Sequence, residues 1–221
     1  MLTPEQVKLQ DTLADAWSQI NVAVQKAVAQ TGLSGSNAGN LSAMMAKNAG
    51  RAMRSLIFAQ FGMARARFFQ AFLAGIKARP VIDSIVHDLR NGHQAVVQLT
   101  NTYAANAERA IAEDTSGDIA NVEATPRDIL LNYVREQFPV VVYKAVKKGG
   151  KWTVEPQLDA QGNPVTSPAA EAARDRLIQD IQALEIPEGP LEQLMTAFGT
   201  DQVAEVTGRS RRLVPGPGGR R

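Results

Sequence analysis

Apolar side chains recur at every third or fourth position near the N-terminus, which predicts an amphipathic helix. Thr3 and Gln6 have the spacing of a capping box, and Pro4 suits the first helical position. Gly32 is a natural stop for this helix, and residues 33–40 are typical of a loop. The side chains expected on the buried face are Leu13, Trp17, Ile20, Val24 and Val28.

A second helix is predicted over residues 41–78, with Gly62 as a candidate breakpoint, and Pro80 is expected to open a further short helix ending at residues 91–92. Phenylalanines lie at helical spacing in this segment, with arginines between them. That interleaving is compatible with stacking on nucleic-acid bases. Aromatic residues at helical spacing are more often core, however, and we favour the core interpretation.

The helical spacing of apolar residues stops at residues 93–102, HQAVVQLTNT, where a short apolar run follows a glycine. Such a run is typical of a buried strand in an α/β sheet. An alanine-rich helix is expected over about 103–113, followed by a loop over 114–124. A strand followed by a helix is the unit from which parallel sheets are built.

The rest of the chain mixes helices with a hairpin. A helix is predicted from Thr125-Pro126 to Pro139, and two β-rich runs flank the turn KKGG, which predicts a hairpin over 140–156. A second turn, two further helices and a strand candidate follow, at residues 159–164, 168–184, 190–199 and 202–208.

The composition excludes several kinds of site. The chain of 221 residues has no cysteine and two histidines, so thiolate chemistry is excluded and a multi-histidine metal centre is not expected. No signal peptide and no apolar run of membrane-spanning length are apparent. We therefore expect a soluble cytoplasmic protein that binds neither metal nor membrane.

Charge is segregated along the chain. The net charge is +6 over residues 1–82, −9 over 83–205 and +5 over 206–221, and no acidic residue lies between Asp15 and Asp83. Such segregation is compatible with a polyanionic partner. It is equally compatible with the basic segment docking on the acidic middle of the same chain.

Motifs of self-sufficient enzymes are missing. The sequence contains no phosphate-binding loop of the G-x-x-x-x-G-K-[ST] type, no G-x-S-x-G elbow and no H-E-x-x-H pair. We therefore expect no catalytic residue in this chain.

Several blocks taken together carry a more specific signal. FFQAFLAGIKARPVIDSIVHDLRNGHQAVVQLTNT, TPRDILLNYVREQFPVVVY, QLDAQGNPVTSPAAEAARDRLIQDIQAL and GPLEQLMTAFGTDQVAEVTGRSRR occur in this order. Their sequence resembles the strawberry notch family of superfamily-two helicases, and most of all its bacterial, plasmid and phage members, which are often fused to a DNA methylase. The resemblance covers about residues 10–213, and its most specific block is DQVAEVTGRSRR, residues 201–212.

The resemblance implies a fold class: α/β, predominantly helical, with an incomplete RecA-like parallel sheet of the P-loop NTPase type and a large insertion of helices and a hairpin. Residues 1–92 would form a helical basic region, 93–113 the first strand–helix unit, 114–199 the insertion, 200–208 the second core strand and 209–221 a disordered basic tail. The first strand would be Gln94–Thr100 and the second Val203–Thr207.

Nucleic-acid contacts are also implied, because ligands bind at the carboxyl ends of parallel strands. The residues at or beyond the ends of these two strands are Thr100, Asn101, Thr102, Gly208, Arg209, Arg211 and Arg212. Ordinary roles in a helix cap, a turn or a dangling tail are open for the same residues.

Two departures from the family limit the expected activity. The upstream domain with the phosphate loop and the magnesium-binding acids is missing, and so are the later motifs with the arginines that reach the nucleotide. We therefore expect a truncated, DNA-engaging portion of such a helicase, inactive alone, with ATP and Mg²⁺ required only by the complete parent. The expected partners are DNA and the missing remainder of the helicase. The alternatives are a free-standing helical DNA-binding or phage/plasmid interaction protein, and a structural helical protein with no nucleic-acid role.

Overall fold

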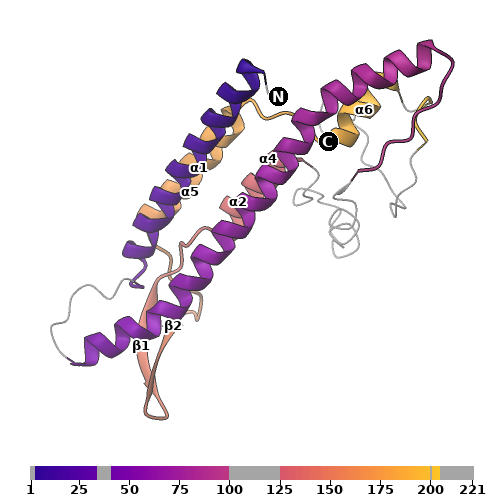
Figure 1. Cartoon of the computed structure of the whole chain (residues 1–221). Helices are drawn as coiled ribbons and strands as arrows, with labels where there is room; N and C mark the ends of the chain where they lie inside the picture. The colour runs from indigo at the N-terminus through magenta and orange to yellow at the C-terminus, as the bar shows by residue number, and fades with distance from the viewer. Residues whose placement is uncertain (1–2, 34–40, 100–124, 200, 205–221) are drawn as a thin grey trace. The chain divides into compact units, whose positions relative to one another are not determined.

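Helices make up most of the described chain, and the only sheet among the described residues has two antiparallel strands (Figure 1). The computed structural model describes residues 3–33, 41–99, 125–199 and 201–204. The chain divides into two compact units: unit 1 comprises residues 1–67 and 130–184, and unit 2 comprises residues 68–129 and 185–221. Each unit is therefore assembled from separated stretches of the chain.

The first helix, α1 (Pro4–Gln30), is confirmed with its cap. The Thr3 hydroxyl accepts a hydrogen bond from the Gln6 backbone N–H, and the Gln6 side chain accepts one from the Thr3 N–H, at 3.3 and 2.9 Å. This reciprocal pairing satisfies two donors that a helix start otherwise leaves free. All five residues expected on the apolar face are buried.

The second helix, α2 (Leu41–Arg90), is longer than predicted. Gly62 does not break it, and Pro80 lies inside it instead of opening a new helix. Proline in a helix interior removes a hydrogen bond and costs about 3 kcal/mol. The helix continues because it buries side chains on both sides of the proline, among them Ile76, Ala78 and Ile85.

The core of unit 1 is built around three aromatic rings. Trp17 of α1 meets Phe61 of α2 edge-on, with ring centroids 5.4 Å apart, and Phe61 meets Tyr133 in the same way at 5.8 Å. Tyr133 belongs to α4 (Pro126–Gln137), which ends just before Pro139, as expected. Edge-to-face contacts of this kind add to the stabilisation from apolar burial. The core interpretation of the phenylalanine pattern is confirmed for Phe61.

The last helix of unit 1, α5 (Pro168–Ala183), lies beside α1 (Figure 1). The Ser167 hydroxyl caps it by accepting a hydrogen bond from the Ala170 N–H at 3.3 Å. Leu177 and Ile181 are its buried aliphatic side chains. The prediction of a helix opening at residues 167–168 is therefore confirmed.

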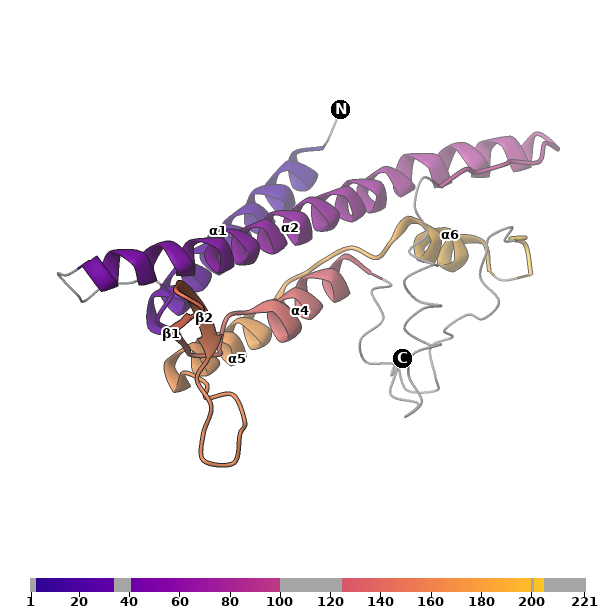
Figure 2. The ribbon, with the colours of Figure 1, turned by 90° about the horizontal axis from the view of Figure 1, so that it is seen from below.

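The predicted hairpin is also confirmed, as β1 (Tyr143–Lys148) and β2 (Lys151–Pro156) joined by Gly149 and Gly150. Both glycines have positive φ, 54° and 82°, as a type I′ turn requires. The view in Figure 2 shows the two strands at the end of unit 1 where α1 ends.

Unit 2 has its own small core. Phe68 and Phe72 stack with centroids 6.2 Å apart, and Phe69 meets both rings edge-on, so the core interpretation holds for this pair as well. The helix α6 (Pro190–Phe198) buries Leu191, Leu194 and Met195, and it ends at Gly199 as predicted. The Gln193 amide donates hydrogen bonds to the carbonyls of Gly75 and Glu188, at 3.0 and 2.7 Å.

The structure does not show the expected strand at Gln94–Thr100 over its described part. Residues 93–99 form no strand, and Val96 and Val97 are 99% and 38% exposed. A strand is stable only when neighbouring strands satisfy its backbone groups, and the described sheet contains β1 and β2 alone. Residues 202–204 are likewise not a strand. Thr100, the 103–124 segment and residues 205–208 of the second expected strand lie outside the described residues.

Candidate nucleic-acid interface

None of the seven residues expected to contact nucleic acid is among those that the structure describes. Thr100, Asn101 and Thr102 fall in one gap, and Gly208, Arg209, Arg211 and Arg212 fall after residue 204. The structure therefore neither brings these residues together nor separates them. Any interface built from described residues has to be found among the basic side chains elsewhere.

The basic residues of α2 divide by what they contact. Arg51 and Lys77 are exposed and have no carboxylate partner among the described residues. Arg65 is exposed as well, and its guanidinium lies 6.0 Å from the centroid of the Phe61 ring. A cation over an aromatic face keeps its charge available to solvent on the other side.

Other basic side chains of α2 already have structural roles. Arg54 donates a hydrogen bond to the backbone carbonyl of Leu33, which ties α2 to the end of α1 within unit 1. Arg79 lies 3.9 Å from Asp83, one helical turn away. This exposed pair contributes little to stability, but it reduces the charge that Arg79 offers to a partner.

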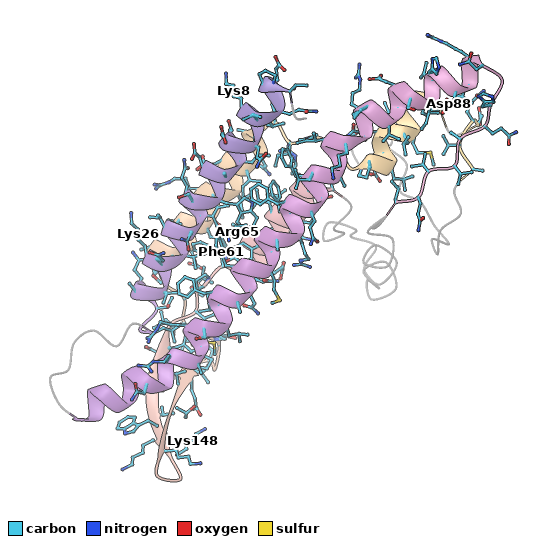
Figure 3. The ribbon with its side chains drawn as sticks, in the orientation of Figure 1. Lys8, Lys26, Phe61, Arg65, Asp88 and Lys148 are labelled. Atoms are coloured by element: carbon cyan, nitrogen blue, oxygen red, sulfur yellow. The ribbon has the colours of Figure 1, made fainter. Side chains whose placement is uncertain are left out.

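A second group of cations lies on the hairpin, where the sequence analysis assigned no function. Four lysines fall within residues 144–151: Lys144, Lys147, Lys148 and Lys151, and all four are exposed. One of them, Lys148, pairs with Glu155 of the opposite strand. Figure 3 labels Lys148 near the turn of the hairpin. The density of lysine around the KKGGK turn was visible in the sequence and could have identified this group.

A hollow of about 270 Å³ lies between α1 and α5 in unit 1. Its walls include the apolar side chains of Ile20 and Ile181 and the carboxyl side chains of Asp15 and Asp180. Two carboxylates at one opening would repel a phosphate group. We therefore do not include this hollow in the nucleic-acid interface.

The described residues show no arrangement typical of catalysis. No group of three or more His, Cys, Asp or Glu side chains within them is close enough to hold a metal ion. His87 lies 3.1 Å from the Asn91 amide, at the exposed end of α2. Burial raises the pKa of the Tyr133 hydroxyl far above its usual value, and this group belongs to the core of unit 1.

Asp159 has a structural role in the second predicted turn. Its carboxylate accepts hydrogen bonds from the backbone N–H groups of Gln161 and Asn163, at 2.9 and 2.8 Å. The bond from Asn163 is the main cause that lowers the pKa of Asp159. The turn prediction at 159–164 is therefore confirmed, and the carboxylate has a role in loop geometry.

In the described part of the chain, no helix combines the length and the apolar character needed to cross a bilayer. The interface candidates are thus the exposed cations of α2 and of the hairpin. Comparisons of the chain with protein-family models, with curated proteins and with solved structures find no match.

Proposed function

We propose that this chain is the DNA-engaging portion of a helicase of the strawberry notch type. One observation carries the proposal: α2 presents basic side chains to solvent with no acidic residue between Leu41 and Asp83. Arg51, Arg65 and Lys77 are exposed there and unpaired with any described carboxylate. Exposed cations that no described carboxylate neutralises attract the phosphates of a nucleic acid.

The alternative role for these cations, docking on the acidic middle of the same chain, receives no support from Arg51 or Lys77. Each would then be expected beside a carboxylate of residues 83–205. Neither forms such a pair among the described residues. Within the described part of the chain, therefore, no carboxylate competes with an external polyanion for these two charges.

The fold proposal that goes with this function is an incomplete RecA-like sheet. In that sheet residues 94–100 and 203–207 would become strands when the remainder of the motor supplies their neighbours. The exposure of Val96 and Val97 supports this idea, because adjacent exposed β-branched residues are costly in water and are suited to a strand. The ordered sequence blocks of the family resemblance are its second support.

Nucleotide hydrolysis belongs, in this proposal, to the complete helicase. ATP and Mg²⁺ would bind where another domain supplies a phosphate loop and magnesium ligands, and where later motifs supply arginines. The proposed contribution of the present chain is to hold DNA through Thr100–Thr102, Gly208, Arg209, Arg211, Arg212 and the cations of α2. The chain alone is then expected to bind DNA without hydrolysing ATP.

DNA binding can be measured by fluorescence polarisation of a labelled oligonucleotide with the full chain, from 50 to 200 mM salt. We expect the logarithm of the binding constant to fall linearly with the logarithm of salt, by roughly 0.7 to 0.9 per phosphate contacted. The double variant Arg51→Gln/Lys77→Gln should bind more weakly and with a shallower slope. A matched control, Lys8→Gln/Arg176→Gln, removes the same charge from α1 and α5. A DNA affinity that does not depend on salt concentration, or an equal loss of affinity in both variants, would contradict the proposal.

An ATPase assay with DNA present tests the second half of the proposal. We expect no turnover from the isolated chain, and turnover restored when the missing helicase segments are added. Turnover by the chain alone would show that the assignment of the nucleotide site to other segments is wrong.

A free-standing DNA-binding or phage/plasmid interaction protein is the second candidate, and the same α2 cations favour it. The neighbouring reading frame separates the two functions. A downstream glycine-rich switch loop and an arginine motif would favour the helicase, whereas unrelated genes would favour the free-standing protein.

A further inference from the structure

The root of the β1–β2 hairpin is fixed to the rest of unit 1 by backbone hydrogen bonds. The Tyr143 N–H donates to the carbonyl of Thr31 at 2.9 Å, which joins the first residue of β1 to the end of α1. The N–H of Val142 donates to Val165 and that of Gln157 to Val142, both at 2.8 Å. The hairpin therefore leaves the body of unit 1 at a defined position.

The turn of the hairpin, in contrast, contacts nothing else that is described. A Cβ built on Gly149 or Gly150 would have no neighbour within 4 Å. Six residues in each strand give the hairpin a length of roughly 20 Å from root to turn. The hairpin thus ends in solvent, where a partner can approach the turn from several sides.

Charge is concentrated at this free end. Register places Lys148 directly opposite Lys151, and Lys147 opposite Trp152. Because successive side chains alternate between faces, Lys148 and Lys151 share one face of the hairpin and Lys147 lies on the other. Glu155, which pairs with Lys148, is the only acidic residue of the two strands. The turn is therefore cationic on both faces.

The pair Lys148–Lys151 opposes folding instead of assisting it. Side chains directly opposite in an antiparallel pair have their Cβ atoms about 5 Å apart, and like charges at that spacing destabilise the strands. The Glu155 carboxylate pairs with Lys148, and no described carboxylate pairs with Lys151. An anion that contacts Lys151 as well as Lys148 would remove the remaining repulsion.

We propose that the end of the hairpin, formed by Lys147, Lys148 and Lys151 around Gly149-Gly150, is a contact site for the phosphate backbone of a nucleic acid. This inference rests on the proposed DNA-engaging function and assigns to it a site separate from α2. The two ammonium groups on one face contact adjacent phosphates, while Lys147 on the other face contacts a further phosphate or the opposite strand.

A nucleic acid fits this site better than an anionic membrane. Segments that enter a lipid surface combine basic residues with apolar side chains that insert below the headgroups. Residues 147–151 contain lysine and glycine only, and the one aromatic side chain beside them, Trp152, is partly buried, so the end of the hairpin offers little apolar surface to insert. A regular array of exposed phosphates, in contrast, is bound by cations alone.

The test uses the full chain and the double variant Lys147→Gln/Lys151→Gln, which retains the Lys148–Glu155 pair. Labelled single- and double-stranded oligonucleotides are titrated at several salt concentrations, and vesicles containing phosphatidylserine are tested by co-sedimentation. We expect a roughly fivefold loss of DNA affinity per lysine at about 0.1 M salt, and a salt slope lower by about 1.4 to 1.8 for the pair. Circular dichroism should show an unchanged or slightly higher melting temperature, because like-charge repulsion has been removed.

The variant Lys8→Gln/Arg176→Gln provides the control, because it removes two exposed charges from other parts of unit 1. A selective loss in the hairpin variant supports the site. Equal affinity of the hairpin variant and the unchanged chain overturns the site but leaves the proposed function standing. Equal losses in the hairpin variant and the control also overturn it, since net charge alone then governs binding. Absence of any DNA binding overturns both proposals, and binding to vesicles but not to DNA replaces this one with a membrane site.

Discussion

Substitution of Gly32 by alanine should destabilise unit 1 more than its small size suggests. Gly32 follows α1 with a φ of 77°, and an added Cβ would lie 2.5 Å from the carbonyl oxygen of Tyr143. Ordinary contact begins at 3.4 Å, so the two segments would have to separate by about 0.9 Å. That carbonyl belongs to the residue whose N–H donates to Thr31, so the separation strains the root of the hairpin.

The magnitude follows from two separate costs. Holding a residue other than glycine in the left-handed region costs about 1–2 kcal/mol. Weakening the backbone hydrogen bond between Tyr143 and Thr31 costs about 1 kcal/mol more. We therefore expect Gly32→Ala to lower the free energy of unfolding of unit 1 by about 2–3 kcal/mol.

Tryptophan fluorescence during urea unfolding measures this change selectively. The chain has two tryptophans, Trp17 and Trp152, and both belong to unit 1. Gly62→Ala is the matched control, because Gly62 is helical and its added Cβ meets nothing within 4 Å. That variant should gain roughly 0.5–1 kcal/mol from helix propensity. If Gly32→Ala unfolds at the same urea concentration as the unchanged protein, the close approach of Gly32 and Tyr143 is refuted.

Two further substitutions test the cores. Tyr133→Phe removes a buried hydroxyl that has no hydrogen-bond partner among the described residues. We therefore expect the free energy of unfolding, in the same urea assay, to stay level or to rise by up to about 1 kcal/mol. A loss of more than about 1 kcal/mol would show that the hydroxyl has a partner. Gln193→Ala removes the hydrogen-bond donors to the carbonyls of Gly75 and Glu188. It should lower the free energy of unfolding of unit 2 by about 1–2 kcal/mol, measured by circular dichroism. Thr196→Ala, on the exposed face of α6, is its control, and equal melting of the two variants would contradict the bridging role of Gln193.

Helix ends were predictable where a local motif decides them. Thr3 with Gln6, and Ser167 before Pro168, satisfy backbone donors within a few residues, so their sequence is sufficient to locate the start of a helix. Gly62 and Pro80 could not be judged in the same way. Whether they break a helix depends on what the neighbouring turns bury, which is a property of the tertiary structure.

The strand expected from residue 94 is not seen in the described residues, for a related reason. A short apolar run has no period of its own, and a strand needs partners that the sequence of the run does not reveal. The hairpin was predictable because its partner lies two residues away, across the Gly149-Gly150 turn. The family resemblance places the expected contacts at the ends of core strands, away from the lysines of the hairpin. The two-residue turn alone would have placed Lys148 opposite Lys151.

The two units cannot be obtained by cutting the chain at a linker. Their boundaries at residues 67/68 and 129/130 lie inside α2 and α4, and the boundary at 184/185 directly follows α5. A truncated protein that ends at residue 67 would expose a severed helix and would lack the Tyr133 ring that packs on Phe61. Deletion mapping of the DNA contacts would therefore confuse loss of folding with loss of binding, and point substitutions on the intact chain are the suitable approach.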